Sequence, residues 1–139
     1  MKNLLIIILA MSLISCKPTV ESILSNHLQP IENQDNKIEI GKTIVFSYCE
    51  REGIDRSKYP EPSYPKIVDT NYFKKLKNKE LNDGTDGGIT TYFEIYEAIK
   101  SGETKIETFE ILSTKIKTKD SIYFQKSKKK LETYSFTIE

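Results

Sequence analysis

The sequence predicts an all-β protein, an antiparallel β-sandwich with at most a minor helix. Aromatic residues are plentiful, with eight Tyr and six Phe, and together with Val, Ile and Thr they favour strands. Short apolar alternations are separated by turn-forming clusters about every ten residues, a spacing typical of sandwiches. The 21 Lys and Arg nearly balance the 20 Asp and Glu, so the charge gives no indication of a nucleic-acid partner.

The first segment, residues 4–14, is apolar except for Ser12, and it leads into Leu13-Ile14-Ser15-Cys16. About 11 helical residues span roughly 16 Å against about 30 Å of bilayer core, so the segment fits a secretory signal. The last four residues resemble the lipobox of bacterial lipoproteins. The resemblance implies cleavage between Ser15 and Cys16, palmitate on Cys16, and a lipid-anchored location on the extracytoplasmic side of the cell envelope. An ordinary cleaved signal is the alternative, although Lys17-Pro18 suits that peptidase badly.

The domain boundaries follow from this start. We expect a lipoprotein signal peptide over 1–15, the lipidated Cys16 and a tether over 16–36, and one sandwich domain over 37–139. The tether is predicted from Pro18, Pro30 and the polar run 32–36, with a short amphipathic helix between Val20 and His27 as an alternative. A disordered tether of this length would reach about 25 Å from the membrane.

Strand signals begin at Ile38. The chain then reads as strands at 38–40, 44–49, 67–68, 89–96, 104–112, 115–118, 121–125 and 134–138, with 72–76 as a strand or a helical turn. Because Ile106 and Phe109 fall on opposite faces, we expect a bulge between them. Turns are predicted at 101–102, 119–120 and 127–130. The lysines of the last turn either discourage edge pairing or contact lipid head groups.

Two loops stand out as candidate partner-binding segments. Residues 50–65 contain Gly53 and three prolines, which predicts a rigid loop, with a polyproline ligand as the alternative. Residues 82–88, with the sequence NDGTDGG, are the strongest turn signal. The candidate binding residues here are Asp83, Gly84, Asp86, Gly87 and Gly88. A calcium loop ending at Glu94 is the alternative, but two of its ligand positions lack oxygen-bearing acids.

Nothing in the sequence predicts catalysis. Cys49 is expected to be a small buried apolar side chain, and a thiol catalyst would have to pair it with His27, the only histidine. The chain lacks a Ser/His/Asp set, a phosphate-binding loop and a dinucleotide motif. One histidine and one free cysteine do not make a zinc site. We therefore expect no enzyme, no metal site and no cofactor.

One pattern resembles a known family. Chagasin-like inhibitors of cysteine peptidases share the succession of Gly87-Gly88, Phe93, Ile95, Ala98, Gly102, Ile106 and Phe109. The stretches IEIGKTIVFSY and YSFTIE resemble the opening and closing strands of that family. The resemblance implies an immunoglobulin-like sandwich whose Gly87-Gly88 loop lies along the peptidase cleft. The family's Asn-Pro-Thr-Thr-Gly loop has no match, and its Arg-Pro-Trp loop is absent because the chain has no Trp.

These observations lead to one functional expectation and one alternative. We expect a membrane-anchored protein-binding module, with inhibition of a cysteine peptidase as its sharpest form, since loops on a rigid sandwich are a common place for recognition. The alternative is a structural or accessory subunit of a cell-envelope assembly that uses an exposed edge strand.

Overall fold

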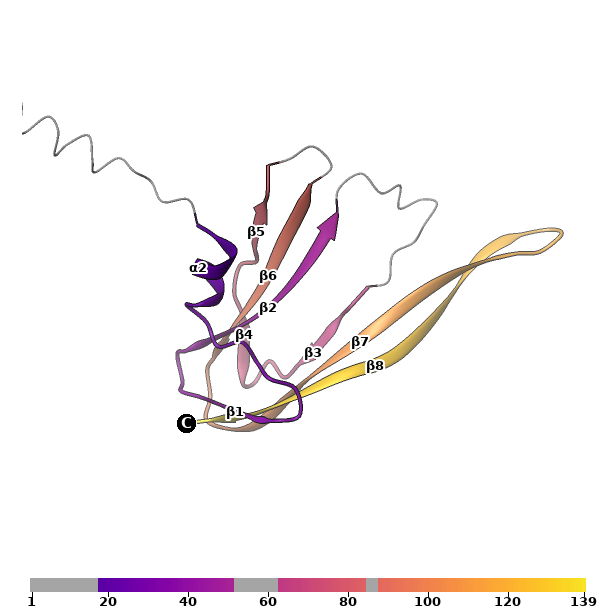
Figure 1. The fold of residues 1–139 in the computed structure, drawn as a ribbon. Helices are drawn as coiled ribbons and strands as arrows, with labels where there is room; N and C mark the ends of the chain where they lie inside the picture. Colours follow the sequence, from indigo (N-terminus) through magenta and orange to yellow (C-terminus); the bar gives the residue numbers. More distant parts are fainter. Residues whose placement is uncertain (1–17, 52–62, 85–87) are drawn as a thin grey trace, which may run out of the picture.

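The computed structural model describes residues 18–51, 63–84 and 88–139 and contains two packed β-sheets (Figure 1). Sheet A has the order β2 (Thr43–Arg51), β6 (Ile89–Ala98) and β4 (Phe73–Lys75), with β5 (Lys79–Asn82) following β4 along the same edge of β6. Sheet B has the order β1 (Asp35–Ile38), β8 (Ile122–Ile138), β7 (Gly102–Lys117) and β3 (Lys66–Val68). All pairs are antiparallel except β1 with β8. The prediction of an all-β sandwich is confirmed.

The main core lies between the sheets. Phe136 of β8 and Phe73 of β4 are 1% exposed, and their rings meet edge to face at 5.1 Å. Such a side chain stabilises the fold by about 1.5–3 kcal/mol when it leaves water. The other buried members of this core are Ile38, Ile44, Tyr96, Ala98, Ile106 and Ile138.

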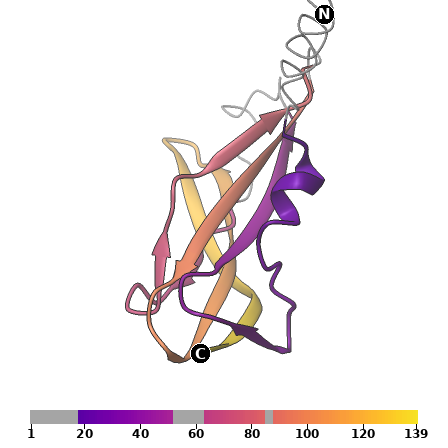
Figure 2. The same ribbon diagram turned by 90° about the vertical axis from the view of Figure 1, so that its left-hand side faces the viewer.

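A second apolar cluster covers the outer face of sheet A. Strand alternation sends Val45, Phe93 and Ile95 to the side opposite the main core. The short helix α2 (Val20–Leu24) lies against them and buries Ile23 (Figure 2). Thr19 begins this helix with a reciprocal capping box.

The described part of the predicted tether is therefore folded onto the domain. After α2, Leu28 donates to the carbonyl of Thr43 and accepts from the amide of Val45. Further on, the buried amide of Asn36 bonds the carbonyls of Ile31 and Ser135. The polar composition of this stretch predicted a loose tether, but a few apolar and amide side chains hold it in place.

The β7–β8 hairpin is longer than the sequence predicted. The expected bulge is confirmed between Glu107 and Phe109. The predicted basic turn at 127–130 is wrong, because Ser127 pairs with Leu112 and Lys130 with Phe109 inside a continuous ladder. The stretch Ser-Lys-Lys-Lys contains no Gly, Pro, Asn or Asp, so nothing in it ends the strand. We call residues 109–131, which project beyond the body in Figure 1, the arm.

Candidate binding end of sheet A

The two candidate loops leave sheet A at the same end. Arg51, the last residue of β2, lies opposite Ile89, the first residue of β6. Asn82 at the end of β5 lies opposite Thr90 on the other side of β6. Neighbouring strands are about 4.8 Å apart, so Arg51 and Asn82, on the two sides of β6, are about 10 Å apart. Figure 1 shows this end away from the C terminus.

The described part of the 82–88 loop has the hydrogen bonds of a tight turn. The amide of Ile89 donates to Asp83 Oδ2 at 3.0 Å, and the amide of Asp83 donates to the carbonyl of Ile89 at 3.1 Å. The amide of Gly84 donates to Asn82 Oδ1, and Gly84 has a φ of 77°, which favours glycine. Gly88, which directly precedes β6, is buried. Asp86 and Gly87 lie outside the described residues, as do Ser15 and Cys16.

Glu94 faces sheet B and is engaged by two lysines. Its carboxylate accepts a hydrogen bond from Lys66 Nζ at 2.6 Å and another from Lys75 Nζ at 2.9 Å. Burial opposes ionisation of Glu94, but the two lysine hydrogen bonds outweigh it and lower its pKa. The calcium-loop alternative is therefore wrong for Glu94. No group of three or more His, Cys, Asp and Glu is close enough to hold a metal within the described ranges.

Aromatic rings surround this ion pair. Tyr48 and Tyr92 face each other across β2 and β6 and stack with ring centroids 5.2 Å apart. Lys66 Nζ lies 5.3 Å from the ring centre of Phe46 and 5.8 Å from that of Tyr48. We call these residues, Phe46, Tyr48, Lys66, Tyr92 and Glu94, the tyrosine–lysine cluster.

The cluster is partly open to solvent, because the two sheets diverge toward this end (Figure 1). Tyr48 is 40% exposed, and its pKa is raised first by burial and then by the nearby carboxylate of Glu94. Rigid tyrosine rings with a polar edge are the side chains that protein interfaces favour. Sequence alternation places Phe46, Tyr48, Tyr92 and Glu94 on inner faces, but it does not indicate that Lys66 reaches them from the other sheet.

Cys49 does not occupy the predicted buried position. It is exposed on the outer face of sheet A, with its Sγ 3.6 Å from Thr91 Oγ1. Alternation directs it to the side that α2 covers, but α2 lies over Val45 and does not extend to Cys49. His27 bonds Thr43 Oγ1 instead, six residues away along β2, which is about 20 Å of strand. The Cys49–His27 catalytic pair is therefore not formed.

Comparisons with known protein families, curated proteins and solved structures found no match to this chain. Within the described ranges, no helix has the length and apolar character that crossing a bilayer requires. Only the geometry of the chain therefore supports the candidate site. This geometry consists of two loop exits at one end of sheet A, a stacked tyrosine pair and an ion pair between the sheets.

Proposed function

We propose that this chain is an extracytoplasmic lipoprotein, attached to a membrane through a lipid on Cys16, that acts as a protein-binding module. The lipobox-like residues Leu13 to Cys16 support the attachment. The binding role is supported by one observation in particular: both loop exits lie beside the stacked Tyr48–Tyr92 pair on a rigid sheet.

The position at which the folded domain begins limits its distance from the proposed anchor. Thr19 caps α2, so at most three peptide units separate Cys16 from the folded body. Three fully extended residues reach about 11 Å. An anchored domain would thus lie close to the bilayer surface, and its partner would be a protein that is itself at or in the membrane.

Co-purification from detergent-solubilised membranes tests the binding role with the anchor intact. We expect a stoichiometric partner with the natural chain and its loss from the double variant Tyr48→Ala/Tyr92→Ala. Ile67→Ala is the matched control, because Ile67 is 52% exposed on sheet B and outside the cluster. A natural chain that purifies alone, or a double variant that retains the partner fully, would contradict the role assigned to the cluster.

Inhibition of a cysteine peptidase is the narrowest form of this proposal. It is supported by the likeness of the Gly87-Gly88 segment to chagasin-like inhibitors and by the position of Gly88 at the loop end of sheet A. Titration of papain with the purified mature chain tests it. We expect stoichiometric loss of activity at micromolar concentration. Undiminished papain activity would rule out peptidase inhibition. The broader role as a protein-binding module would then be tested by the co-purification experiment alone.

An accessory subunit that binds through a strand edge is the second candidate. The outer edge of β2 is bonded by Leu28 at Thr43 and Val45, and the strand continues past that contact to Arg51. A partner strand could add there. The amide of Ser47 points the same way as that of Val45, so Ser47→Pro removes an outward donor. Loss of the partner from Ser47→Pro, with retention in Tyr48→Ala/Tyr92→Ala, would favour this candidate.

A further inference from the structure

The arm exposes its residues to an unusual degree. Every residue from Lys117 to Leu131 is exposed, although β7 and β8 pair continuously as far as Lys117 and Ile122. The turn at the end is well defined, because Thr118 donates to the carbonyl of Ser121 at 2.8 Å. The arm is therefore an ordered ribbon that makes little contact with the core.

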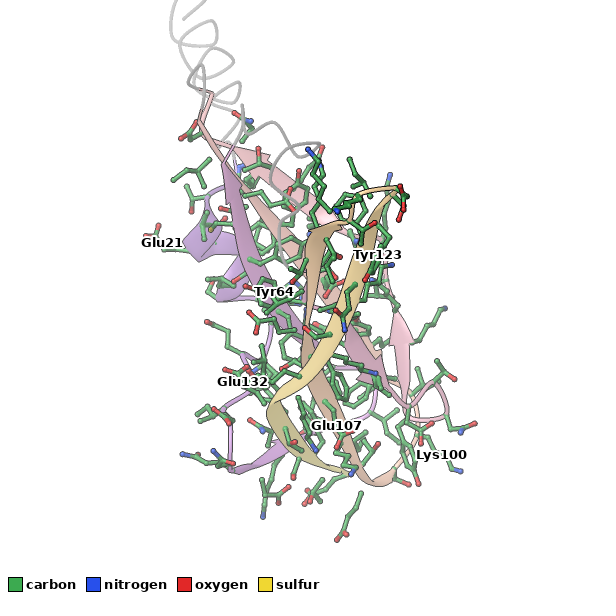
Figure 3. All side chains as sticks on the ribbon, turned by 90° about the vertical axis from the view of Figure 1, so that its right-hand side faces the viewer. Glu21, Tyr64, Lys100, Glu107, Tyr123 and Glu132 are labelled. Carbon is green, nitrogen blue, oxygen red and sulfur yellow. The ribbon has the colours of Figure 1, made fainter. Side chains whose placement is uncertain are left out.

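Apolar side chains gather at the end of this ribbon. Ile122, Tyr123 and Phe124 follow the turn directly and are 56%, 49% and 51% exposed. Successive strand residues point to opposite faces, so Tyr123 lies on one face and its two neighbours lie on the other. Figure 3 shows Tyr123 on the arm, at the opposite end of the molecule from Lys100. Apolar side chains thus lie on both faces of the ribbon, directly behind the polar turn at residues 118–121.

Two lysines, Lys115 and Lys117, lie beside the apolar residues on one face of the arm, and we call them the lysine collar. Lys117 pairs with Ile122 and Lys115 with Phe124, and paired residues share a face. Across the whole arm seven lysines stand against two acidic residues, Glu110 and Asp120. The chain as a whole is nearly neutral, so the positive charge is concentrated in this projection.

We propose that the arm tip, residues 115–126, inserts its apolar side chains into the surface of an anionic phospholipid bilayer, with the lysine collar at the head groups. Clustered lysines are attracted to anionic lipid surfaces, and aromatic side chains favour the interface. The position of the arm agrees with the anchor. The arm tip and α2, the described helix nearest to Cys16, both lie toward the end away from the C terminus (Figures 1 and 2).

A bilayer suits this tip better than a protein pocket does. A pocket in a protein partner engages one face of a ribbon, whereas a fluid interface accepts apolar side chains on both faces. The lysine stems can also extend toward the phosphates while their methylenes stay in apolar surroundings. The orientation relative to the membrane rests on the anchor proposed above, but insertion of the tip does not.

The absence of tryptophan from the chain makes a clean probe available. Phe124→Trp places one indole at the tip, and the matched control Ile40→Trp places one at a similarly exposed residue near the C-terminal end of sheet B. Each full mature chain is mixed with phosphatidylcholine vesicles with or without phosphatidylglycerol, with brominated acyl chains as the quencher. We expect quenching of Phe124→Trp on anionic vesicles at least about threefold stronger than that of Ile40→Trp.

The lysine collar is tested in chains that also carry Cys16→Ser, so that a lipid anchor does not itself hold them on the vesicles. Replacing Lys115 and Lys117 by Gln in the Phe124→Trp chain should lower partitioning to anionic vesicles about tenfold, and raised salt should act in the same direction. These residues are exposed, so thermal unfolding should be unchanged. Equal quenching of Phe124→Trp and Ile40→Trp, or binding that the lysine changes do not weaken, would overturn the proposal.

The arm and the anchor are separated by repeating the measurement with Cys16→Ser added. Quenching that survives in this chain, together with absent lipid labelling of the natural chain, would retain the arm proposal and remove the anchor. Lipid labelling of the natural chain, together with no quenching of its Phe124→Trp form, would retain the anchor and overturn the arm proposal.

Discussion

Lys66 of β3 donates a 2.6 Å hydrogen bond to Glu94 of β6, so one ion pair joins the two sheets where they diverge. The Lys66 side chain is 10% exposed and that of Glu94 is 17% exposed, so water screens this pair weakly. Lys75 gives Glu94 its second partner. The sheets are thus connected near their open end by electrostatics, and at their closed end by apolar packing.

Glu94→Gln should destabilise the fold. It leaves the ammonium of Lys66, whose side chain is 10% exposed, without its counter-charge, which costs about 1–3 kcal/mol. Urea unfolding of the two chains measures this loss. Glu80→Gln, at an exposed residue of the adjacent β5, is the control and should change the unfolding free energy by less than about 0.5 kcal/mol. Equal effects from the two changes would contradict a role for the ion pair.

The carboxyl group of Glu94 also predicts that the stability of the fold falls at acid pH. The pKa of Glu94 in the folded chain lies below its ordinary value of 4.5, so the unfolded chain binds more protons in that range. The stabilisation by Glu94 is complete when the pH is above the ordinary pKa, and it is lost as the pH falls through the lowered pKa of the folded chain. Unfolding free energies of the natural chain and of Glu94→Gln should therefore converge as the pH falls below the ordinary pKa of 4.5. A constant difference across this range would count against the assignment.

Phe136 provides the test of the core between the sheets. Phe136→Ala removes a ring that is 1% exposed and packed on Phe73, so we expect a loss of about 3–5 kcal/mol. Ile67→Ala, at a residue that is 52% exposed, should cost less than about 0.5 kcal/mol. Thermal or urea unfolding distinguishes them. A Phe136→Ala chain as stable as the control would mean that the sheets do not pack as described.

His27 predicts a second pH range in which the stability of the fold changes. Burial lowers its pKa below 6.5, with a further contribution from Lys79, so the folded chain resists protonation that the unfolded chain accepts. Stability is complete above 6.5 and falls as the pH drops through the lowered value. As the pH falls below 6.5, the natural chain should lose more stability than His27→Gln does. Parallel losses in both chains would show that His27 does not titrate in this way.

Local patterns in the sequence predicted much of the fold. The alternation in β6 identified its two faces, and the phase break between Ile106 and Phe109 identified the bulge. Both features depend on residues that are close together along the chain, so the sequence alone reveals them. The length of the arm was missed because the expected turns depended on composition, whereas the ladder between Phe109 and Lys130 depends on pairing between distant residues.

The candidate site was predicted only in part. The loop exits at Asn82 and Arg51 were expected, since turn-forming residues mark them. The tyrosine–lysine cluster was not, because Lys66 and Glu94 come from different sheets, and local spacing does not indicate which sheets meet. The exposure of Cys49 was missed for a similar reason, because the extent of α2 over sheet A decides it.

Metabolic labelling with palmitate in a bacterial host tests the central claim, attachment through Cys16, most directly. The chain has two cysteines, so Cys49→Ser is the matched control for Cys16→Ser. We predict label in the natural chain and in Cys49→Ser, and none in Cys16→Ser. An unlabelled natural chain, or a labelled Cys16→Ser chain, would contradict the account.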